Sequence, residues 1–170
     1  MDAALLVLRV TIGLLVAAHG AQKLFGWFGG GGLGETSKFM ASLGFRRAFG
    51  WTVIGALAEF AGGLLLALGL FSPLGSLGVG AAMAIAVTRI HWPKLWAQQH
   101  GFEYALVLLA AAVAVGLTGP GAYSLDAVWG TALPVPLRGV ALAITAVGYL
   151  AAMVSSMSPA AAPSKATPAS

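Results

Sequence analysis

Residues 51–92 read WTVIGALAEFAGGLLLALGLFSPLGSLGVGAAMAIAVTRIHW. Two apolar stretches in this segment, 51–71 and 74–92, are separated only by Ser72 and Pro73. Each stretch is close to the roughly 20 apolar residues that an α-helix needs to cross a bilayer. Because so short a connection allows only a tight turn, the sequence predicts two antiparallel membrane-spanning helices.

Three more apolar stretches bring the predicted crossings to five; they are residues 5–25, 102–117 and 138–154. We therefore predict an all-α fold, a transmembrane helical bundle whose four-helix core occupies residues 1–126. Residues 127–154 are expected to form a connection and a fifth, C-terminal helix. Residues 155–170 are mostly Ala, Ser and Pro, a composition that cannot bury a core, so we expect this tail to be disordered.

The composition excludes a water-soluble domain. Of the 170 residues, 59% are hydrophobic and 8% are charged, and the mean hydropathy is +0.90. Soluble globular proteins carry about 25% charged residues. The net charge of +4 does not indicate nucleic acid as a partner, because the basic residues flank apolar stretches, where they orient membrane proteins. The chain has no cysteine, so any redox role requires a bound cofactor or a partner.

The basic residues also predict the orientation in the membrane. Those that flank the first and third connections are Lys23, Lys38, Arg46, Arg47, Arg89 and Lys94. Only Arg9 and Arg138 flank the opposite side, and Arg9 is expected to snorkel there. Because Lys and Arg accumulate in cytoplasmic connections, we predict a multi-pass protein of the plasma (cytoplasmic) membrane. Its first and third connections lie in the cytoplasm and its N-terminus lies outside.

The first connection also contains a predicted amphipathic helix. Its residues are 35–45, with Phe39, Met40 and Leu43 on the face expected to contact the bilayer.

Ionisable residues inside the apolar stretches are the candidates for function. Each costs about 2.5 to 3.5 kcal/mol near the middle of a membrane helix, so each needs a partner or water. Glu59 is expected to be the deepest carboxyl group, about 12 Å from the side of the first connection, and His19 lies about 9 Å from that side. The other candidates in the same half of the membrane are Gln22, Lys23, Arg89, His91, Glu103 and Tyr104. We predict that these groups form one polar cluster, in which Arg89 or Lys23 neutralises Glu59.

Such a cluster is typical of a proton relay, or of a site for the oxygen atoms of a quinone headgroup, whose reduction takes up protons. The alternative is that buried ion pairs only hold the helices in register. Haem is not expected, because His19 and His91 lie at different depths and axial ligands must face each other. A metal site is not expected either, because no His or carboxylate pair has a suitable spacing and a third ligand.

Four blocks of residues, in the same order, resemble the DoxX family of small membrane proteins. They are LR at 8–9 with HGAQKLFG at 19–26, EFAGG at 59–63 with GL at 69–70, EYAL at 103–106, and GPGAYSLD at 119–126. The resemblance covers about residues 5–126. It implies a four-helix membrane bundle and a link to membrane redox systems that use quinones, and the predicted fifth helix lies beyond it.

The cluster and the resemblance together predict an integral membrane subunit or accessory protein of a quinone-linked redox system. Quinone is then the expected ligand, and redox proteins are the expected partners. Two other functions are compatible with the same residues. One is a small-molecule or ion carrier, whose charges line a water-filled path, and the other is a scaffold that recruits soluble redox enzymes. The small-residue faces of the helices are also compatible with a homo-oligomer.

Overall fold

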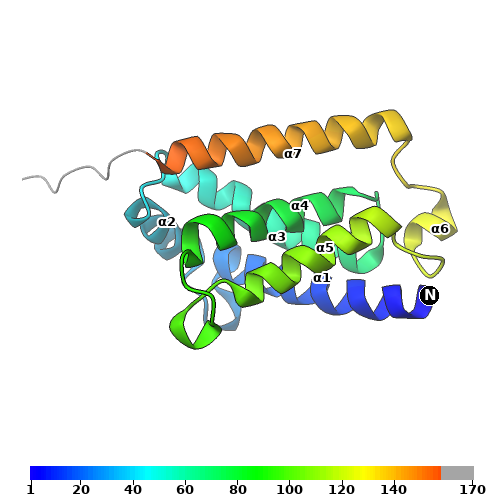
Figure 1. The fold of residues 1–170 in the computed structure, drawn as a ribbon, viewed down its shortest axis with the longest axis horizontal. Coiled ribbons are helices and arrows are strands. Elements are labelled where there is room, and N and C mark those ends of the chain that lie inside the picture. Colours follow the sequence, from blue (N-terminus) through cyan, green and yellow to red (C-terminus); the bar gives the residue numbers. More distant parts are fainter. Residues whose placement is uncertain (158–170) are drawn as a thin grey trace, which may run out of the picture.

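A computed structural model describes residues 1–157 of the chain. In this part the chain forms helices and no strands, so the predicted all-α bundle is confirmed (Figure 1). The α-helices are α1 (Asp2–Phe25), α2 (Gly32–Ser42), α3 (Ala48–Leu68), α4 (Leu74–Ile85), α5 (Glu103–Thr118), α6 (Leu125–Trp129) and α7 (Val135–Ser156). A π-helical turn, Ala86–His91, continues α4, and short 3-10 turns lie at Trp27–Gly29 and Ala97–Gln99.

Four of the helical stretches in residues 1–157 are long and apolar enough to cross a membrane. They are α1, α3, α7 and Leu74–His91, the last of which joins α4 to the π-helical turn. α5, with 16 residues, is about 24 Å long. It is shorter than the hydrocarbon core of about 30 Å, so four of the five predicted crossings have full length.

Glycine residues let the backbones of α1 and α3 approach each other. A Cβ atom on Gly13 would lie 2.5 Å from the carbonyl oxygen of Gly63, and one on Gly63 would lie 2.5 Å from that of Gly13. A Cβ atom on Gly20 would lie 2.4 Å from the backbone nitrogen of Phe60. Helices in lipid gain stability from such close dispersion contacts, since water provides no force that drives them together.

The same contacts show that α1 and α3 are antiparallel but staggered. Gly13 faces Ala67 and Gly20 faces Phe60, so α3 extends past the C-terminal end of α1 by roughly two turns. α2 packs against both helices where α3 extends beyond the end of α1. Of the residues on α2 predicted to face lipid, Phe39 is about half exposed, whereas Met40 is partly buried and lines a cavity between α2 and α3. Met40 thus shares this cavity with residues of α3, because α2 covers the part of α3 that α1 leaves open. The expected contact of this face with the bilayer stays a prediction.

Arg9 does not snorkel, in contrast to the prediction. Arg9 is only 2% exposed, and its guanidinium donates hydrogen bonds to the backbone carbonyls of Ala67 and Tyr123. Gly69, whose φ is +61°, makes room for it, because a Cβ atom there would lie 3.0 Å from Nη1 of Arg9 and 2.6 Å from the Cβ of Ser124. The arginine thus joins α1, the end of α3 and the segment before α6.

Asp126 holds the turn between α3 and α4 at the same end of the bundle. Its carboxylate accepts hydrogen bonds of 2.8 Å from the backbone nitrogens of Phe71 and Ser72 and from the hydroxyl of Thr131. Burial raises the pKa of this carboxyl, but the hydrogen bonds, first among them the backbone bond from Ser72, outweigh burial and hold the pKa below its ordinary value. At the end of the bundle where the N-terminus lies, the polar contacts of Arg9 and Asp126 therefore hold α1, the turn between α3 and α4, and the segment around α6 together.

α7 lies along the outside of the bundle, next to α4, and most of its surface is exposed (Figure 1). It is attached near its C-terminal end, where the Ser155 carbonyl accepts from the backbone nitrogen of Arg46 at 3.1 Å. The segment before α7 is attached by a 3.0 Å hydrogen bond from the backbone nitrogen of Leu133 to the carbonyl of Ser72. Ser155 and Ser156, which we assigned to the tail, belong to α7, and the rest of the tail lies outside the described residues.

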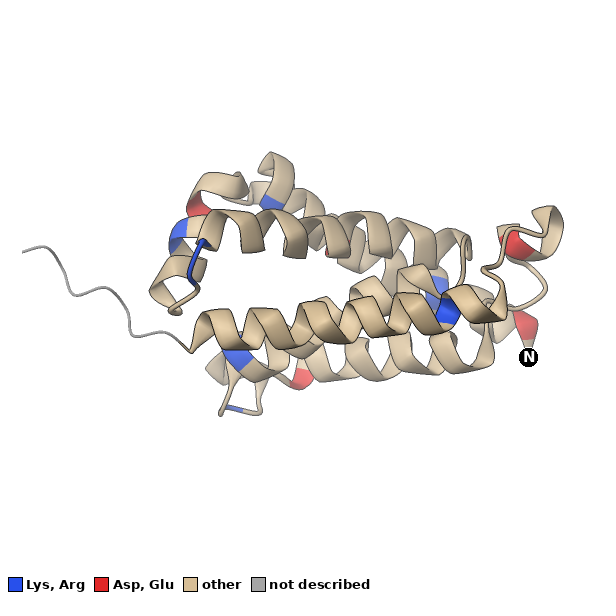
Figure 2. Ribbon diagram, turned by 90° about the horizontal axis from the view of Figure 1, so that it is seen from above, with Lys and Arg blue, Asp and Glu red and all other residues tan. Residues whose placement is uncertain are grey.

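Lys and Arg gather mainly at the end of the bundle away from the N-terminus, with a smaller group nearer the N-terminus (Figure 2). This asymmetry underlies the predicted orientation.

We predict that Gly63→Ala lowers the free energy of unfolding by about 1–3 kcal/mol, because the new methyl group overlaps the backbone of α1. The matched control is Gly139→Ala on α7, where a Cβ atom meets nothing within 4 Å. Thermal unfolding in detergent, followed by circular dichroism, measures both. Equal midpoints for the two variants would contradict the close packing of α1 and α3.

Candidate functional site

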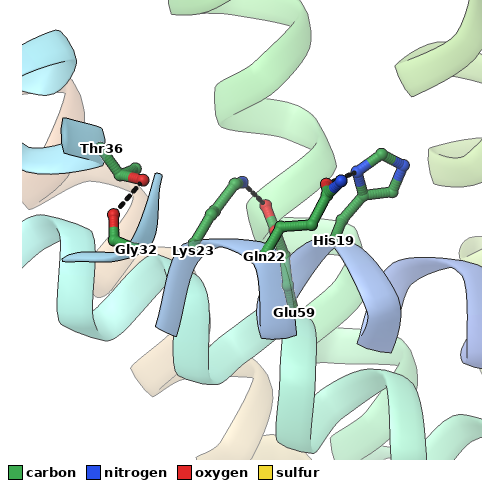
Figure 3. A network of polar contacts seen from close by, with 6 residues as sticks. All are labelled: His19, Gln22, Lys23, Gly32, Thr36 and Glu59. Carbon is green, nitrogen blue, oxygen red and sulfur yellow. Dashed lines mark hydrogen bonds and ion pairs between the residues drawn. The ribbon is translucent and has the colours of Figure 1, made fainter. Parts of the chain in front are cut away.

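Glu59 is a buried carboxylate in the middle of α3. The residue is 4% exposed, and its Oε1 forms an ion pair with Nζ of Lys23 (Figure 3). Its Oε2 is also buried and has no hydrogen-bond partner among the described residues. A carboxylate accepts hydrogen bonds at both oxygens, so half of this group is left unsatisfied inside the protein.

The stagger of α1 and α3 explains how Lys23 reaches Glu59. Glu59 lies eleven residues into α3, about 16 Å from its start. Lys23 lies in the last turn of α1, where the helix dipole favours a positive charge. Because α3 extends past the end of α1, the end of one helix lies level with the middle of the other. Of the two predicted partners of Glu59, the structure selects Lys23.

A cavity of about 310 Å³ adjoins this ion pair. It is lined by residues of α2, α3, α4 and α7, by Lys23 at the end of α1 and by Ile90 in the π-helical turn. Glu59 and Lys23 are the charged residues among the described residues that line it. The wall is otherwise mostly apolar, with side chains such as Met40, Ile85 and Ile144.

The hydroxyl groups that line the cavity already have partners. The hydroxyls of Thr36, Thr52 and Thr145 each donate to a carbonyl of their own helix, at 2.8 to 2.9 Å. The hydroxyl of Tyr149 lies 3.5 Å from that of Thr88. The protons of these threonine hydroxyls are therefore engaged, and the free oxygen of Glu59 and the ammonium of Lys23 are the charged groups that face a ligand in the cavity.

Three of the other predicted site residues form a second polar group on and beside α1. Nδ1 of His19 lies 3.2 Å from Oε1 of Gln22 (Figure 3). Nε2 of Gln22 donates to the carbonyl of Phe28 at 3.2 Å. The ring of Tyr104 stands edge-on to that of His19, with the centroids 6.0 Å apart. His19, Gln22 and Tyr104 do not line the cavity.

The remaining three predicted residues lie elsewhere. Arg89 does not bind Glu59 but donates to the carbonyl of Ser156 at 2.6 Å, at the C-terminal end of α7, where a cation is favoured. Nδ1 of His91 lies 2.7 Å from the carbonyl of His100. Glu103 accepts from the backbone nitrogen of Ala97 at 2.9 Å. The last two contacts hold the connection between α4 and α5 together, so the structure divides the predicted single cluster into separate groups.

The sequence did not identify the uncharged residues of the cavity wall, such as Trp51 on α3 and Gly148 on α7. Apolar residues and glycines occur throughout the spans, so nothing in their pattern distinguishes those that line a cavity from those that pack or face lipid. In residues 1–157, no group of three or more His, Cys, Asp and Glu residues is placed to hold a metal ion.

We predict that Lys23→Met strongly destabilises the protein, because it leaves the Glu59 carboxylate buried without a counter-ion. Breaking a fully buried ion pair costs about 3–5 kcal/mol, and because the Lys23 side chain is 32% exposed, we expect a loss toward or below the lower end of that range. The double variant Lys23→Met/Glu59→Gln should recover much of this loss, since neither charge is then present. Thermal unfolding of the single and double variants measures the coupling, with Lys38→Met on α2 as the control. Strictly additive losses would show that the two side chains do not interact.

The DoxX family model matches residues 4–92, which is more than half of the chain and includes Lys23 and Glu59. The blocks at 103–106 and 119–126, and the whole of α7, lie beyond the matched residues. Searches of curated proteins and of solved structures gave no match. Together with the apolar helices, the family match makes this a multi-pass membrane protein. The expected resemblance is confirmed, and the chain belongs to the DoxX family.

Proposed function

We propose that this membrane protein is a subunit or accessory protein of a quinone-linked redox system, and that its cavity binds a quinone or quinol headgroup. One observation carries the proposal. Glu59 keeps a buried oxygen that has no partner in residues 1–157, beside Lys23 and next to an apolar cavity. A buried polar atom of this kind is costly unless a ligand or water satisfies it.

The residues present fit the chemistry of such a ligand. Small-molecule sites are mostly apolar, occupy about 300–1,000 Å³ and place a few polar groups where they fix the orientation. The apolar wall suits a ring and the start of a hydrocarbon tail. The ammonium of Lys23 can donate a hydrogen bond to a carbonyl oxygen, and the free oxygen of Glu59 can accept one from a hydroxyl group. The pair therefore suits both the oxidised and the reduced headgroup.

A bound quinone supplies the uptake of two electrons and two protons. Glu59 is the group of this chain that holds or moves a proton beside the headgroup, while Lys23 orients the headgroup and balances the charge of the carboxylate. The chain contains no cysteine. In this proposal, the electrons come from a partner protein or from a cofactor that the partner carries, which is why we assign the chain as a subunit or accessory protein.

Tryptophan fluorescence tests the proposal, because Trp51 lines the cavity. Trp27, Trp92, Trp96 and Trp129 are all exposed and can be replaced by Phe, leaving Trp51 as the reporter. We predict that decylubiquinone quenches the fluorescence of Trp51 in detergent and that the quenching saturates as the quinone concentration rises. Glu59→Gln should weaken binding by about tenfold or more, because it removes a charged hydrogen-bond acceptor. Glu35→Gln, an exposed carboxylate on α2, should leave binding unchanged.

A cavity-filling variant separates the role of the space from that of the charge. A Cβ atom on Gly55 meets nothing within 4 Å, and Gly55 lines the cavity. Gly55→Leu should therefore block quenching while the ion pair and the melting temperature are retained. Quenching that is linear in quinone concentration and equal in all variants would reflect only partition into micelles, and it would refute the proposed site.

A further inference from the structure

A second hollow lies between α3 and α7, at the end of the bundle where α7 ends. It is a groove of about 730 Å³. One side carries Arg46 and Arg47, which precede α3, and Gly50 of α3, and the other carries Val147, Leu150 and Val154 of α7. The groove is therefore apolar along its length, with two basic residues at one end.

The two arginines are exposed and carry uncompensated charge. Lys23 and Glu59 form the only salt bridge in the described residues, so no carboxylate neutralises Arg46 or Arg47. Arg47 has a φ of +55°, in the left-handed region that a side chain rarely adopts. Such strained positions occur preferentially where a side chain has a binding role.

We infer that this groove is a binding site for an anionic phospholipid. The guanidinium groups of Arg46 and Arg47 are suited to a phosphate, with which arginine forms paired, charge-assisted hydrogen bonds. The apolar part of the groove, from Val147 to Val154 on α7, extends about 10 Å along the helix and accommodates the first part of an acyl chain. A soluble anion would use only the arginines and would leave the apolar part uncovered.

The position of the groove supports a lipid as the occupant. It lies at the end of the bundle where Lys and Arg gather (Figure 2). Such basic residues near a membrane surface attract anionic lipids. The inference is independent of the quinone proposal, although Trp51 and Ile54 line both the groove and the cavity beside Glu59. Nε1 of Trp51 donates to Oγ of Ser155 at 2.8 Å, so a lipid in the groove would contact the attachment of α7 to α3.

Native mass spectrometry of the full chain tests the site with micelles that contain equal amounts of dioleoylphosphatidylglycerol and dioleoylphosphatidylcholine. We expect bound phosphatidylglycerol to exceed phosphatidylcholine by about tenfold or more, as two basic residues at an anionic surface provide. Arg46→Gln/Arg47→Gly should lose this preference, and glycine adopts the backbone conformation of residue 47 without strain. The control, Lys38→Gln/Lys94→Gln, removes the same charge from the same end and should keep the preference.

The variant Gly50→Leu tests the groove itself, because it keeps both arginines. A Cβ atom on Gly50 meets nothing within 4 Å, so leucine fills the groove without disturbing the fold, which an unchanged melting temperature confirms. It should reduce bound phosphatidylglycerol by about tenfold. Full binding by Gly50→Leu, or equal loss in the lysine control, would overturn the inference in favour of general charge attraction. Displacement of the lipid by millimolar inorganic phosphate would instead identify a site for a soluble anion.

Discussion

A carboxylate inside an apolar bundle must be neutralised, and this requirement connects most features of the structure. Glu59 lies in the middle of α3 and is 4% exposed, and a charge placed among apolar residues in a membrane helix needs a partner. Lys23 neutralises it, but only because α1 and α3 are staggered and lie backbone to backbone. Glycines at 13, 20 and 63 make that approach sterically feasible. The ion pair therefore depends on the close packing of α1 and α3. A side chain added at these glycines would move Lys23 as well as destabilise the bundle.

The ion pair satisfies only half of the carboxylate, and the remaining oxygen gives the cavity its chemical character. The threonine hydroxyls in the wall donate to carbonyls of their own helices, so they add polarity without offering a proton to a ligand. α7 forms one wall of the cavity, although it lies outside the part of the chain that matches the DoxX family model. In this chain the charged groups come from the family region, whereas one wall of the site comes from a helix beyond it.

The sequence predicted the parts of the structure that depend on local composition. The apolar stretches gave the long helices, and Ser72-Pro73 marked the turn between α3 and α4. The buried position of Glu59 followed from the cost of a charge among apolar residues. The partner of Glu59 did not follow, because Lys23 and Arg89 were equally suitable until the stagger of α1 and α3 was known. Arg9 was mispredicted for a related reason: its partners are backbone carbonyls from α3 and the segment before α6, which no residue pattern identifies.

Photoaffinity labelling tests the central claim, that the free oxygen of Glu59 and its cavity form a headgroup site, most directly. An azido-quinone is photolysed with the purified protein, and the labelled peptides are identified by mass spectrometry. The account predicts labelling concentrated on α3 and α7 around Gly55 and Gly148, the two glycines of the cavity wall with open space beside them, and its loss in Glu59→Gln. Labelling spread over the lipid-facing surfaces of all helices, and unchanged in Glu59→Gln, would contradict it.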